Sequence, residues 1–592
     1  MPIQGRNSGP PRVLLLVDAA WRLGPRPLAS YFVHRLSHAA GLPRRRLRLR
    51  GPEGAPVPGA ILAPHLPAPP RLPFTDLARL RAVLASLPPA TWHGPFDPAA
   101  GALGMDLFRP GDVRPVWEAN RLSWLPWLVQ AARLWPEEGH GAELQSRLTE
   151  WQAANPPFQG PNWACGQEAA LRALHMALAL VLAGQAREPS LPAQGFLALH
   201  ARRIGATRSY ARAQDNNHGI SEPAGLLVCA WLLGEEGRAR RAARDLSAAV
   251  ARLVAPDGGF AQLSTGYHRL LLDTLSVVEV LRRALGRPPL PAPFASRAAA
   301  AATWLARLVA ENGAMPMLGH QDGSTLADLS VGGAGDARGS VERAMRLFAG
   351  RSAGFGEDAG CCWLGLATMP ATPRELVWRG GGCLGWESAG ARGLLRAGPL
   401  RFRPGQADLL HFELWDGSRP VLADAGTGAY NPPAEKAWWL DYFPSAAAHN
   451  TVTFDGREPM PRLSRFLLAR WPRIRPLPSG EATGAALRDH HGNRHMRLVR
   501  PEGREWLVED RVAGRFHELV LRWRLGSGKW RLMDGAVESE GARIAISADA
   551  PLTLSLETGW ESPAYGEARP CPVLVARAAA PVRRLLTRIA LR

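Results

Sequence analysis

The sequence predicts an α+β multidomain fold in which an (α/α) toroid of helical hairpins precedes an antiparallel β-sandwich. A chain of 592 residues is too long for one hydrophobic core, so more than one domain is expected. Between residues 105 and 350, apolar side chains recur with the i, i+3, i+4 spacing of amphipathic helices. After residue 375 the pattern changes to short apolar runs separated by Gly, Asp-Gly and Pro-Glu-Gly turns, which is typical of antiparallel strands.

The helical segments are separated by loops rich in Gly, Pro and Asn, such as "NPPFQGPN" and "APDGG". Helices of short to medium length with broad apolar faces, connected in this way, favour hairpins packed in a ring. The absence of a tight sequence repeat disfavours a tetratricopeptide-like array. The helical segments are "VWEANRLSWLPWLVQAARLW", "EAALRALHMALALVLAGQ", "PAGLLVCAWLLG", "LLLDTLSVVEVLRRALG" and "RAAAAATWLARLVA".

These patterns predict three regions along the chain. Residues 1–100 are a segment rich in Pro and Arg with short helices, residues 101–372 form the toroid, and residues 373–592 form the β-sandwich. Strand-like runs in the last region include "HNTVTFDG", "MRLVRPEGREWLVEDRV" and "HELVLRWRLG".

Charge and cysteine content narrow the class of protein. Lys and Arg number 71 against 52 Asp and Glu, a formal net charge of +19 that is compatible with a polyanionic partner. The arginines are spread over the whole chain without a recognised nucleic-acid module, which argues against a nucleic-acid partner.

Six cysteines without CxxC spacing give no disulfide framework. The "VLLLV" run is too short to span a membrane and no cleavage site follows it, so the expected location is the cytoplasm, with the periplasm or cell envelope as the alternative.

The segment "QDNNHGISEPAGLL" (214–227) concentrates polar groups at the head of an apolar helix. Capping by Asp215 or Asn216 of a helix that begins near Ser221, Glu222 and Pro223 explains one polar group and the proline. Asn217, His218 and Glu222 remain without a structural reason. They are therefore predicted to belong to a site.

Two further polar loops lie at helix ends. "DGGFAQLSTGYH" places Tyr267 and His268 at the start of a helix after a Gly-rich turn, and "MPMLGHQDGSTL" carries His320, Gln321 and Asp322. In a toroid the loops at one end line a single opening, so these loops are expected to converge with Asn217 and His218.

Polar residues also interrupt the predicted strands. Gln406, His411, Asp424 and His449 occur in otherwise apolar runs, where they satisfy buried backbone groups or ligate a metal. A mixed Asp and His set spread over three segments is a weak signal for a metal site.

Taken in order, "DVRPVWEANR", "NNHGISEPAGLL", "DGGFAQLSTGYH", "QDGS", "QADLLHFELWDGSRPVLADAGTGAYN" and "AHNTVTFDG" resemble the heparinase II/III-like family of polysaccharide lyases over roughly residues 105–530. The resemblance implies a toroid followed by a β-sandwich. It also implies β-elimination on an acidic polysaccharide (EC 4.2.2.-), with some relatives serving exopolysaccharide metabolism.

By position, the resemblance makes Asn217 the amide that neutralises a uronate carboxylate, His218 the adjacent imidazole and Tyr267 the acid or base. Asp424 and His449 match ligands of a structural divalent metal, zinc or calcium. Where the family often has His-Gly-His-Ala-Asp, this chain has Pro404 and Gln406 in place of the two histidines, which places both that metal and the histidine-dependent chemistry in question.

β-Elimination removes the C5 proton of a uronate and expels the C4 oxygen, so donors on the carboxylate stabilise the developing charge. The expected substrate-binding residues are Asn216, Glu222, Arg121, His268, Gln406 and His411, with Glu222 orienting His218.

Two alternatives to a lyase remain open. A toroid glycoside hydrolase would use two carboxylates among Asp215, Glu222, Asp257 and Asp322. A non-catalytic protein that binds or assembles acidic polysaccharide would have kept only the cleft.

Overall fold

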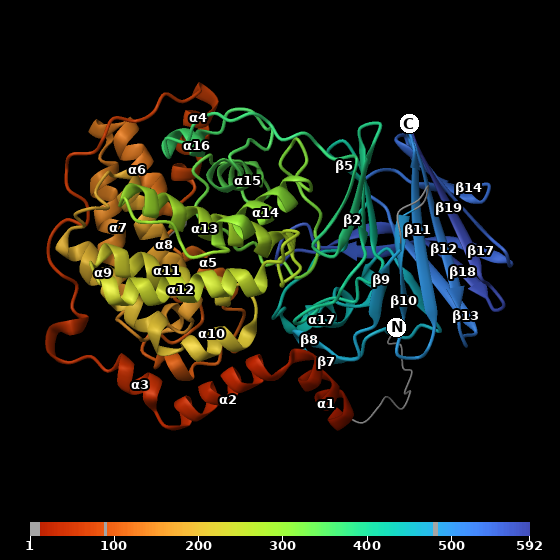
Figure 1. Ribbon diagram of the computed structural model, residues 1–592, viewed down its shortest axis with the longest axis horizontal. Coiled ribbons are helices and arrows are strands. Elements are labelled where there is room, and N and C mark those ends of the chain that lie inside the picture. Colours follow the sequence, from red (N-terminus) through yellow and green to blue (C-terminus); the bar gives the residue numbers. More distant parts are fainter. Residues whose placement is uncertain (1–11, 88–90, 478–482) are drawn as a thin grey trace. The chain divides into compact units, whose positions relative to one another are not determined.

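The computed structural model describes residues 12–87, 91–477 and 483–592 and divides the chain into two compact units (Figure 1). The helical unit comprises residues 29–374 and 431–435. The β unit comprises 375–430, 436–592 and the described residues up to Leu28. The Pro/Arg-rich segment predicted over 1–100 is therefore not a domain of its own, because its helices are shared between the two units.

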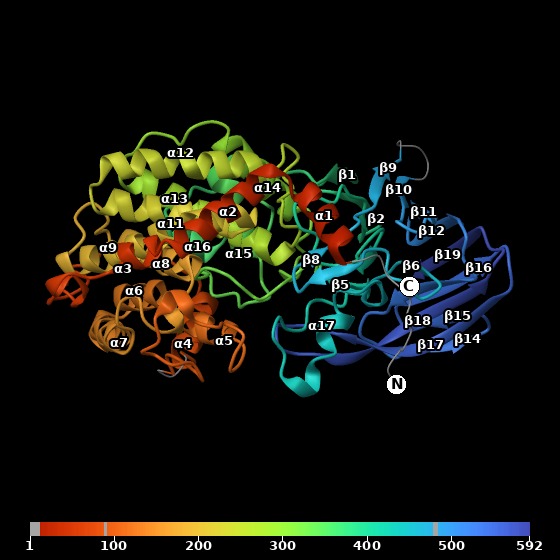
Figure 2. The same cartoon turned by 90° about the horizontal axis from the view of Figure 1, so that it is seen from below.

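The helical unit is built from hairpins whose central helices are buried on nearly all sides. In α8 (Gly166–Leu182), every residue except Val181 is buried, and α11 and α13 are almost as enclosed. Figures 1 and 2 show α8, α11, α12 and α13 running side by side. The helices of the chain up to this region are α1 (Arg12–Leu23), α2 (Pro25–Ala39), α3 (Leu42–Leu47), α4 (Phe74–Ala85), α5 (Arg114–Ala119), α6 (Trp124–Leu134), α7 (His140–Ala154), α9 (Leu191–Ala206), α10 (Arg208–Gln214), α11 (His218–Leu232), α12 (Glu236–Leu253), α13 (Thr265–Ala284), α14 (Phe294–Ala306), α15 (Arg338–Ala344) and α16 (Ala359–Trp363).

Helix α11 begins earlier than the sequence suggested. Its first residue is His218, and Pro223 lies inside the helix. Asp215 does not cap it: Asp215 ends α10 in the left-handed conformation (φ 45°) and binds Arg252 through both carboxylate oxygens, at 2.8 and 2.6 Å. The predicted start near Ser221 was therefore wrong by one turn.

The β unit contains sheets of five, eight, four and two strands, and every pairing between its described strands is antiparallel. Their orders are β1-β2-β3-β4-β5, β14-β15-β16-β19-β12-β11-β10-β9, β17-β18-β13-β6 and β7-β8. Aromatic residues such as Phe412, Trp506 and Trp523 are fully buried in a core that draws on strands of the three larger sheets, as expected for sheets packed face to face.

The strands and remaining helix of this unit are β1 (Val377–Gly380), β2 (Cys383–Ser388), β3 (Ala391–Arg396), β4 (Phe412–Asp416), β5 (Arg419–Leu422), α17 (Trp439–Tyr442), β6 (Val452–Phe454), β7 (Arg462–Ser464), β8 (Leu467–Leu468), β9 (Arg473–Pro476), β10 (Thr483–Arg488), β11 (Arg494–Glu502), β12 (Glu505–Ala513), β13 (Glu518–Arg524), β14 (Arg531–Met533), β15 (Ala536–Glu538), β16 (Ala542–Ala548), β17 (Leu552–Glu561), β18 (Arg569–Ala579) and β19 (Arg584–Leu591). Among the helices that the structure describes, none is long and apolar enough to cross a bilayer.

Candidate active site

Three buried helices of the helical unit present polar residues at their N-terminal ends. Helices α8, α11 and α13 pack on one another, and Gln167, Asn217 and Tyr267 lie at their respective starts. The Asn217 side-chain amide donates to Gln167 Oε1 at 2.8 Å, and the Asn217 backbone N–H donates to Gln262 Oε1 at 3.0 Å. Because helix N-termini carry partial positive charge, three of them held together in this way favour an anion.

Tyr267 is held by an ion pair. Its hydroxyl donates to Asp322 Oδ2 at 2.8 Å, and the same oxygen lies 3.0 Å from Arg114 Nε. Burial raises the pKa of Asp322, but the guanidinium of Arg114 outweighs burial and leaves that pKa below its ordinary value. Asp322 is therefore ionised and accepts a charge-assisted hydrogen bond from the Tyr267 hydroxyl.

The loop that carries Asp322 is attached to the start of α13. The Thr265 hydroxyl donates to Pro316 O at 2.5 Å, the Thr265 backbone N–H donates to Leu318 O at 3.3 Å, and the Gln321 amide donates to the Thr265 hydroxyl at 2.9 Å. These contacts fix the position of Asp322 relative to Tyr267.

Arg121 does not occupy the substrate-binding position predicted for it. It is 1% exposed and makes two 2.7 Å bonds to Glu168, which leaves its guanidinium fully engaged inside the unit. Its remaining nitrogen donates to Glu118, which also accepts from Arg114. Arg121 thus supports Arg114 through shared carboxylates rather than by reaching a ligand.

His218 and Glu222 form a pair on the first turns of α11. His218 Nδ1 lies 3.0 Å from Glu222 Oε1, so Nδ1 donates and Nε2 carries the lone pair of the neutral ring. Glu222 is buried, and its second oxygen has no hydrogen-bond partner among the described residues. A Cβ at Gly166 would lie 2.8 Å from that oxygen, so a larger residue there would displace the Glu222 carboxylate.

The structure shows where the other predicted substrate-binding residues lie. His268 is 1% exposed, stacks on Trp304 with ring centroids 4.7 Å apart, and donates to a backbone carbonyl; burial lowers its pKa to about 4. Asn216 bonds locally to Gln214 and to the His218 backbone. Gln406 and His411 are both buried within the β unit.

Some residues that complete the site had no assigned role in the sequence. Asp322 was recognised as part of a polar loop and as one of four carboxylates for the hydrolase alternative, and Arg114 only as part of a motif. Gln167 lies in a helix that also carries Glu168, Arg172 and His175, and a single glutamine there gives no sequence signal.

His411, Asp424 and His449 lie together in the β unit, with one potential ligand atom from each within 4.8 Å of the others. His411 Nδ1 accepts the Asn450 backbone N–H at 2.9 Å, so its Nε2 carries the proton and donates toward Glu413 and Asp424. Asp424 accepts from His449 Nδ1 at 2.7 Å and from the Gly426 N–H at 2.8 Å. In the neutral ring, His411 therefore has no free lone pair at either nitrogen, and both Asp424 oxygens already accept a hydrogen bond.

The pKa of His449 also indicates that this cluster is held by an ion pair and not by a metal. Burial lowers the pKa of His449, but the Asp424 carboxylate outweighs burial and raises it above the ordinary value. The two residues therefore form a buried ion pair. Among Gln406, His411, Asp424 and His449, the buried side-chain atoms without a hydrogen-bond partner in the described residues are His449 Nε2 and Gln406 Oε1, and one imidazole with one amide does not make a zinc site. The residues present do not fit the metal that the resemblance implied.

Chelation should accordingly leave this unit unchanged. We expect the midpoint of thermal unfolding to be the same before and after dialysis against EDTA, because hydrogen bonds rather than a metal hold the cluster. Differential scanning calorimetry with elemental analysis of the same sample checks this. One equivalent of zinc or calcium per chain, with a lower midpoint after dialysis, would show that the cluster binds a metal.

The fold and the site define a protein of the toroid-plus-sandwich class. Within the chain, residues 387–583 match the family described as "Heparinase II/III-like, C-terminal". A search of curated proteins finds no significant match.

Solved structures show the same fold over nearly the whole chain. A heparinase III aligns over 96% of this chain and 91% of its own, with a TM-score of 0.64 and 16% identity. A second heparinase III, the BT4657 gene product, aligns over 99% and 94%, with a TM-score of 0.61 and 15% identity. The heparan sulfate lyase HepC from Pedobacter heparinus aligns over 94% and 90%, with a TM-score of 0.55 and 16% identity. At these identities the likeness establishes the fold.

Proposed function

We propose that the chain is a polysaccharide lyase that cleaves an acidic, uronate-containing polysaccharide by β-elimination and serves exopolysaccharide metabolism. The observation that carries the proposal is the Tyr267 hydroxyl, held by Asp322 and Arg114 at the start of one of three adjoining helices. The names of the similar structures, heparinase III and a heparan sulfate lyase, agree with this chemistry.

Each group has a role in elimination. The three helix N-termini and the Asn217 amide bind the uronate carboxylate and stabilise the charge that develops on it as the C5 proton leaves. His218 Nε2, left with its lone pair by the bond to Glu222, takes that proton. Tyr267 keeps its own proton because its neighbour Asp322 is ionised, and donates it to the departing C4 oxygen. His218 thereby supplies the base that Pro404 cannot.

Three of the four carboxylates considered for a hydrolase are already engaged by other groups. A glycosidase needs one carboxyl group whose pKa is raised so that it stays protonated. Asp322 has a lowered pKa, and Asp215 is bound to Arg252 by both oxygens. Glu222 is paired with His218. In the proposed elimination these acids are orienting groups: Asp322 orients Tyr267, and Glu222 orients His218.

The test is incubation with a panel of uronate polymers, including heparan sulfate, alginate and the acidic glycan of the producing strain. Elimination leaves a carbon–carbon double bond in the new chain end, so ultraviolet absorbance should rise with time. Reducing ends without absorbance would instead indicate hydrolysis. Binding without either product would support the non-catalytic alternative.

A substitution at Gly319 tests whether the Asp322 loop positions Tyr267. Gly319 has φ +68°, and a Cβ there would lie 1.8 Å from Leu263 O, so Gly319→Ala must move the loop. We expect about a tenfold or greater loss of kcat, since small displacements of a catalytic group are costly. The matched control is Gly323→Ala, which has φ +71° but no atom within 4 Å. Equal losses in the two variants would trace the effect to backbone strain instead.

A further inference from the structure

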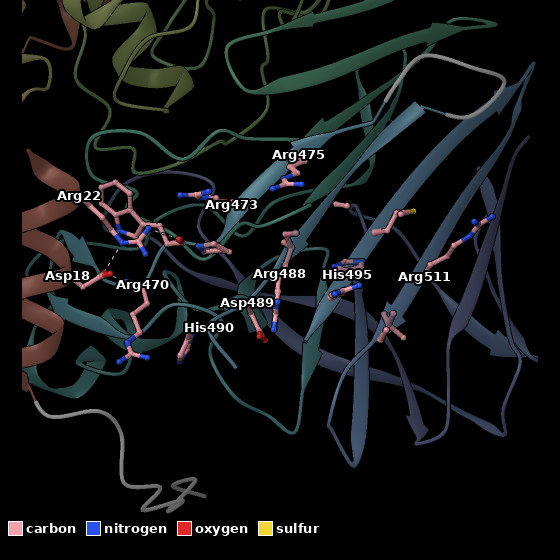
Figure 3. Close-up of a pocket in the computed structure, with 18 residues that line it drawn as sticks. Asp18, Arg22, Arg470, Arg473, Arg475, Arg488, Asp489, His490, His495 and Arg511 are labelled. Atoms are coloured by element: carbon pink, nitrogen blue, oxygen red, sulfur yellow. Dashed lines mark hydrogen bonds and ion pairs between the residues drawn. The ribbon is translucent and has the colours of Figure 1, made fainter. Parts of the chain in front are cut away.

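The β unit contains a basic hollow that no step of the proposed reaction uses. It has a volume of about 900 Å³, and seven arginines and two aspartates are among the described residues that line it. Figure 3 shows Asp18 and Arg22 of α1 on one side of this hollow, and Arg473, Arg475 and Arg488 on the strands. All of its lining residues belong to the β unit, whereas Tyr267 and Asn217 belong to the helical unit.

The register of the eight-stranded sheet places arginines side by side. Arg488 of β10 lies directly opposite Arg473 of β9 on one side and Arg494 of β11 on the other, and all three are exposed. Like charges directly opposite each other on a sheet are destabilising. No carboxylate of the described residues pairs with any of these three guanidinium groups. Folding alone gives no reason for such a row, whereas an anionic ligand does.

The next row on the same face has a different character. It runs Arg475, Ala486, Met496 and Arg511 across the four strands, so a small apolar floor lies between two arginines. Neighbouring strands are about 4.8 Å apart, and alternate residues of one strand are about 6.8 Å apart. Arg511 is itself paired with Glu509 at 2.9 Å. Arg473, Arg475, Arg488 and Arg494 have no carboxylate partner among the described residues, and this array of cations lies beside a flat apolar patch, which suits a sugar ring that carries acidic substituents.

The two aspartates do not neutralise this array. Asp18 is bound to Arg22 at 2.8 Å and accepts the Arg470 backbone N–H at 2.6 Å. Asp489 accepts three bonds from its own turn, from the His491 N–H and from the backbone and side chain of Asn493. The hollow as a whole therefore keeps a strong positive potential.

We propose that this hollow is a second, non-catalytic binding site for a segment of an acidic polysaccharide, with its carboxylates or sulfates on the row Arg473, Arg488 and Arg494. Guanidinium groups bind planar or tetrahedral anions through paired hydrogen bonds. The volume matches sites that enclose small ligands, and is too small for a nucleic-acid duplex. The identity of the anion rests on the proposed function, but the existence of an anion site does not. Two sites on one polymer would raise its effective affinity.

The test compares two pairs of substitutions in the full-length Tyr267→Phe protein, so that no polymer is cut. Arg488→Gln with Arg494→Gln removes two charges from the hollow, and Arg531→Gln with Arg583→Gln removes two exposed charges elsewhere on the β unit. Fluorescence anisotropy with labelled heparan sulfate and alginate at fixed ionic strength gives Kd. We expect the first pair to weaken binding about tenfold or more and the control pair about twofold at most.

Other outcomes separate the possibilities. Both pairs should unfold at or above the temperature of the parent protein, because the first pair relieves repulsion; a lower midpoint for the first pair would contradict an unpaired row. Equal weakening by the two pairs would mean that overall charge, not this hollow, binds the polymer. If single-stranded DNA binds as tightly as the polysaccharides, and the first pair of substitutions removes that binding too, the assignment to polysaccharide is wrong. If the active protein eliminates no polymer but the first pair still weakens binding selectively, the lyase proposal fails and this one stands.

Discussion

Replacing Tyr267 with Phe should lower kcat for β-elimination by about 10²–10⁴-fold, the range that a positioned general acid contributes. The substitution removes one oxygen and keeps the ring, which is 7% exposed and packed in the unit. Asp322 keeps its ion pair with Arg114, at 3.0 Å, so the site should retain its shape. KM should therefore change little. Initial rates of ultraviolet absorbance over a range of polymer concentrations give both constants.

The matched control is Tyr210→Phe, at an exposed tyrosine of α10 in the same unit. It should leave kcat unchanged. If Tyr267→Phe keeps full turnover, another group donates the proton and the mechanism is wrong. If KM rises while kcat holds, Tyr267 binds the substrate without taking part in proton transfer.

The sequence placed the polar residues of this site at helix starts, although the predicted start of α11 was one turn too late. Asn217 and His218 are polar residues that an otherwise apolar helix does not need for its packing, and in the structure they lie at the start of α11. Tyr267, after a Gly-rich turn, lies in the first turn of α13 with Ser264 as its cap. Local composition was enough for these residues, because capping and turn chemistry are read from neighbours in the chain.

Pairings between distant residues could not be predicted in the same way. Arg114 and Asp322 are 208 positions apart, and only the packed helices bring them together. His268 shows the reverse error: one residue after Tyr267 on a helix is a rotation of about 100°, which turns its ring into the core against Trp304. A residue next to a site residue in the sequence therefore lies on a different face of the helix.

The β unit shows the same limit. The resemblance aligned Asp424 and His449 with metal ligands and found Gln406 in a third position, but not that His411 would join them. Whether such a cluster binds a metal depends on where each lone pair points, which hydrogen bonds to Asn450 and Gly426 decide. A composition of Asp and His cannot carry that information.

Replacing Asp510 with Asn should cost about 3–5 kcal/mol of stability at neutral pH, because it leaves a buried arginine without its partner. Asp510 is fully buried and binds Arg497 at 2.7 and 3.1 Å and His495 at 2.6 Å. Arg497 in turn donates to the carbonyls of Leu410 and Asn450, so the loss reaches the segments that hold His449. Asp416, a partly buried carboxylate of the same unit whose ion-pair partners Arg419 and Arg504 are exposed, provides the control.

The effect should depend on pH. Burial raises the pKa of Asp510, but Arg497 and His495 outweigh burial and lower it to about 2. A carboxyl group whose folded pKa lies below its unfolded value of about 3.9 contributes stability above that value, and the contribution is lost as pH falls through the folded pKa. Thermal unfolding of both proteins between pH 7 and pH 2 should therefore show a difference that is constant down to about pH 4 and shrinks below it. A difference that stays constant to pH 2 would show that Asp510 acts through packing and not through its charge, whereas Asp416→Asn should change stability by less than about 1 kcal/mol throughout.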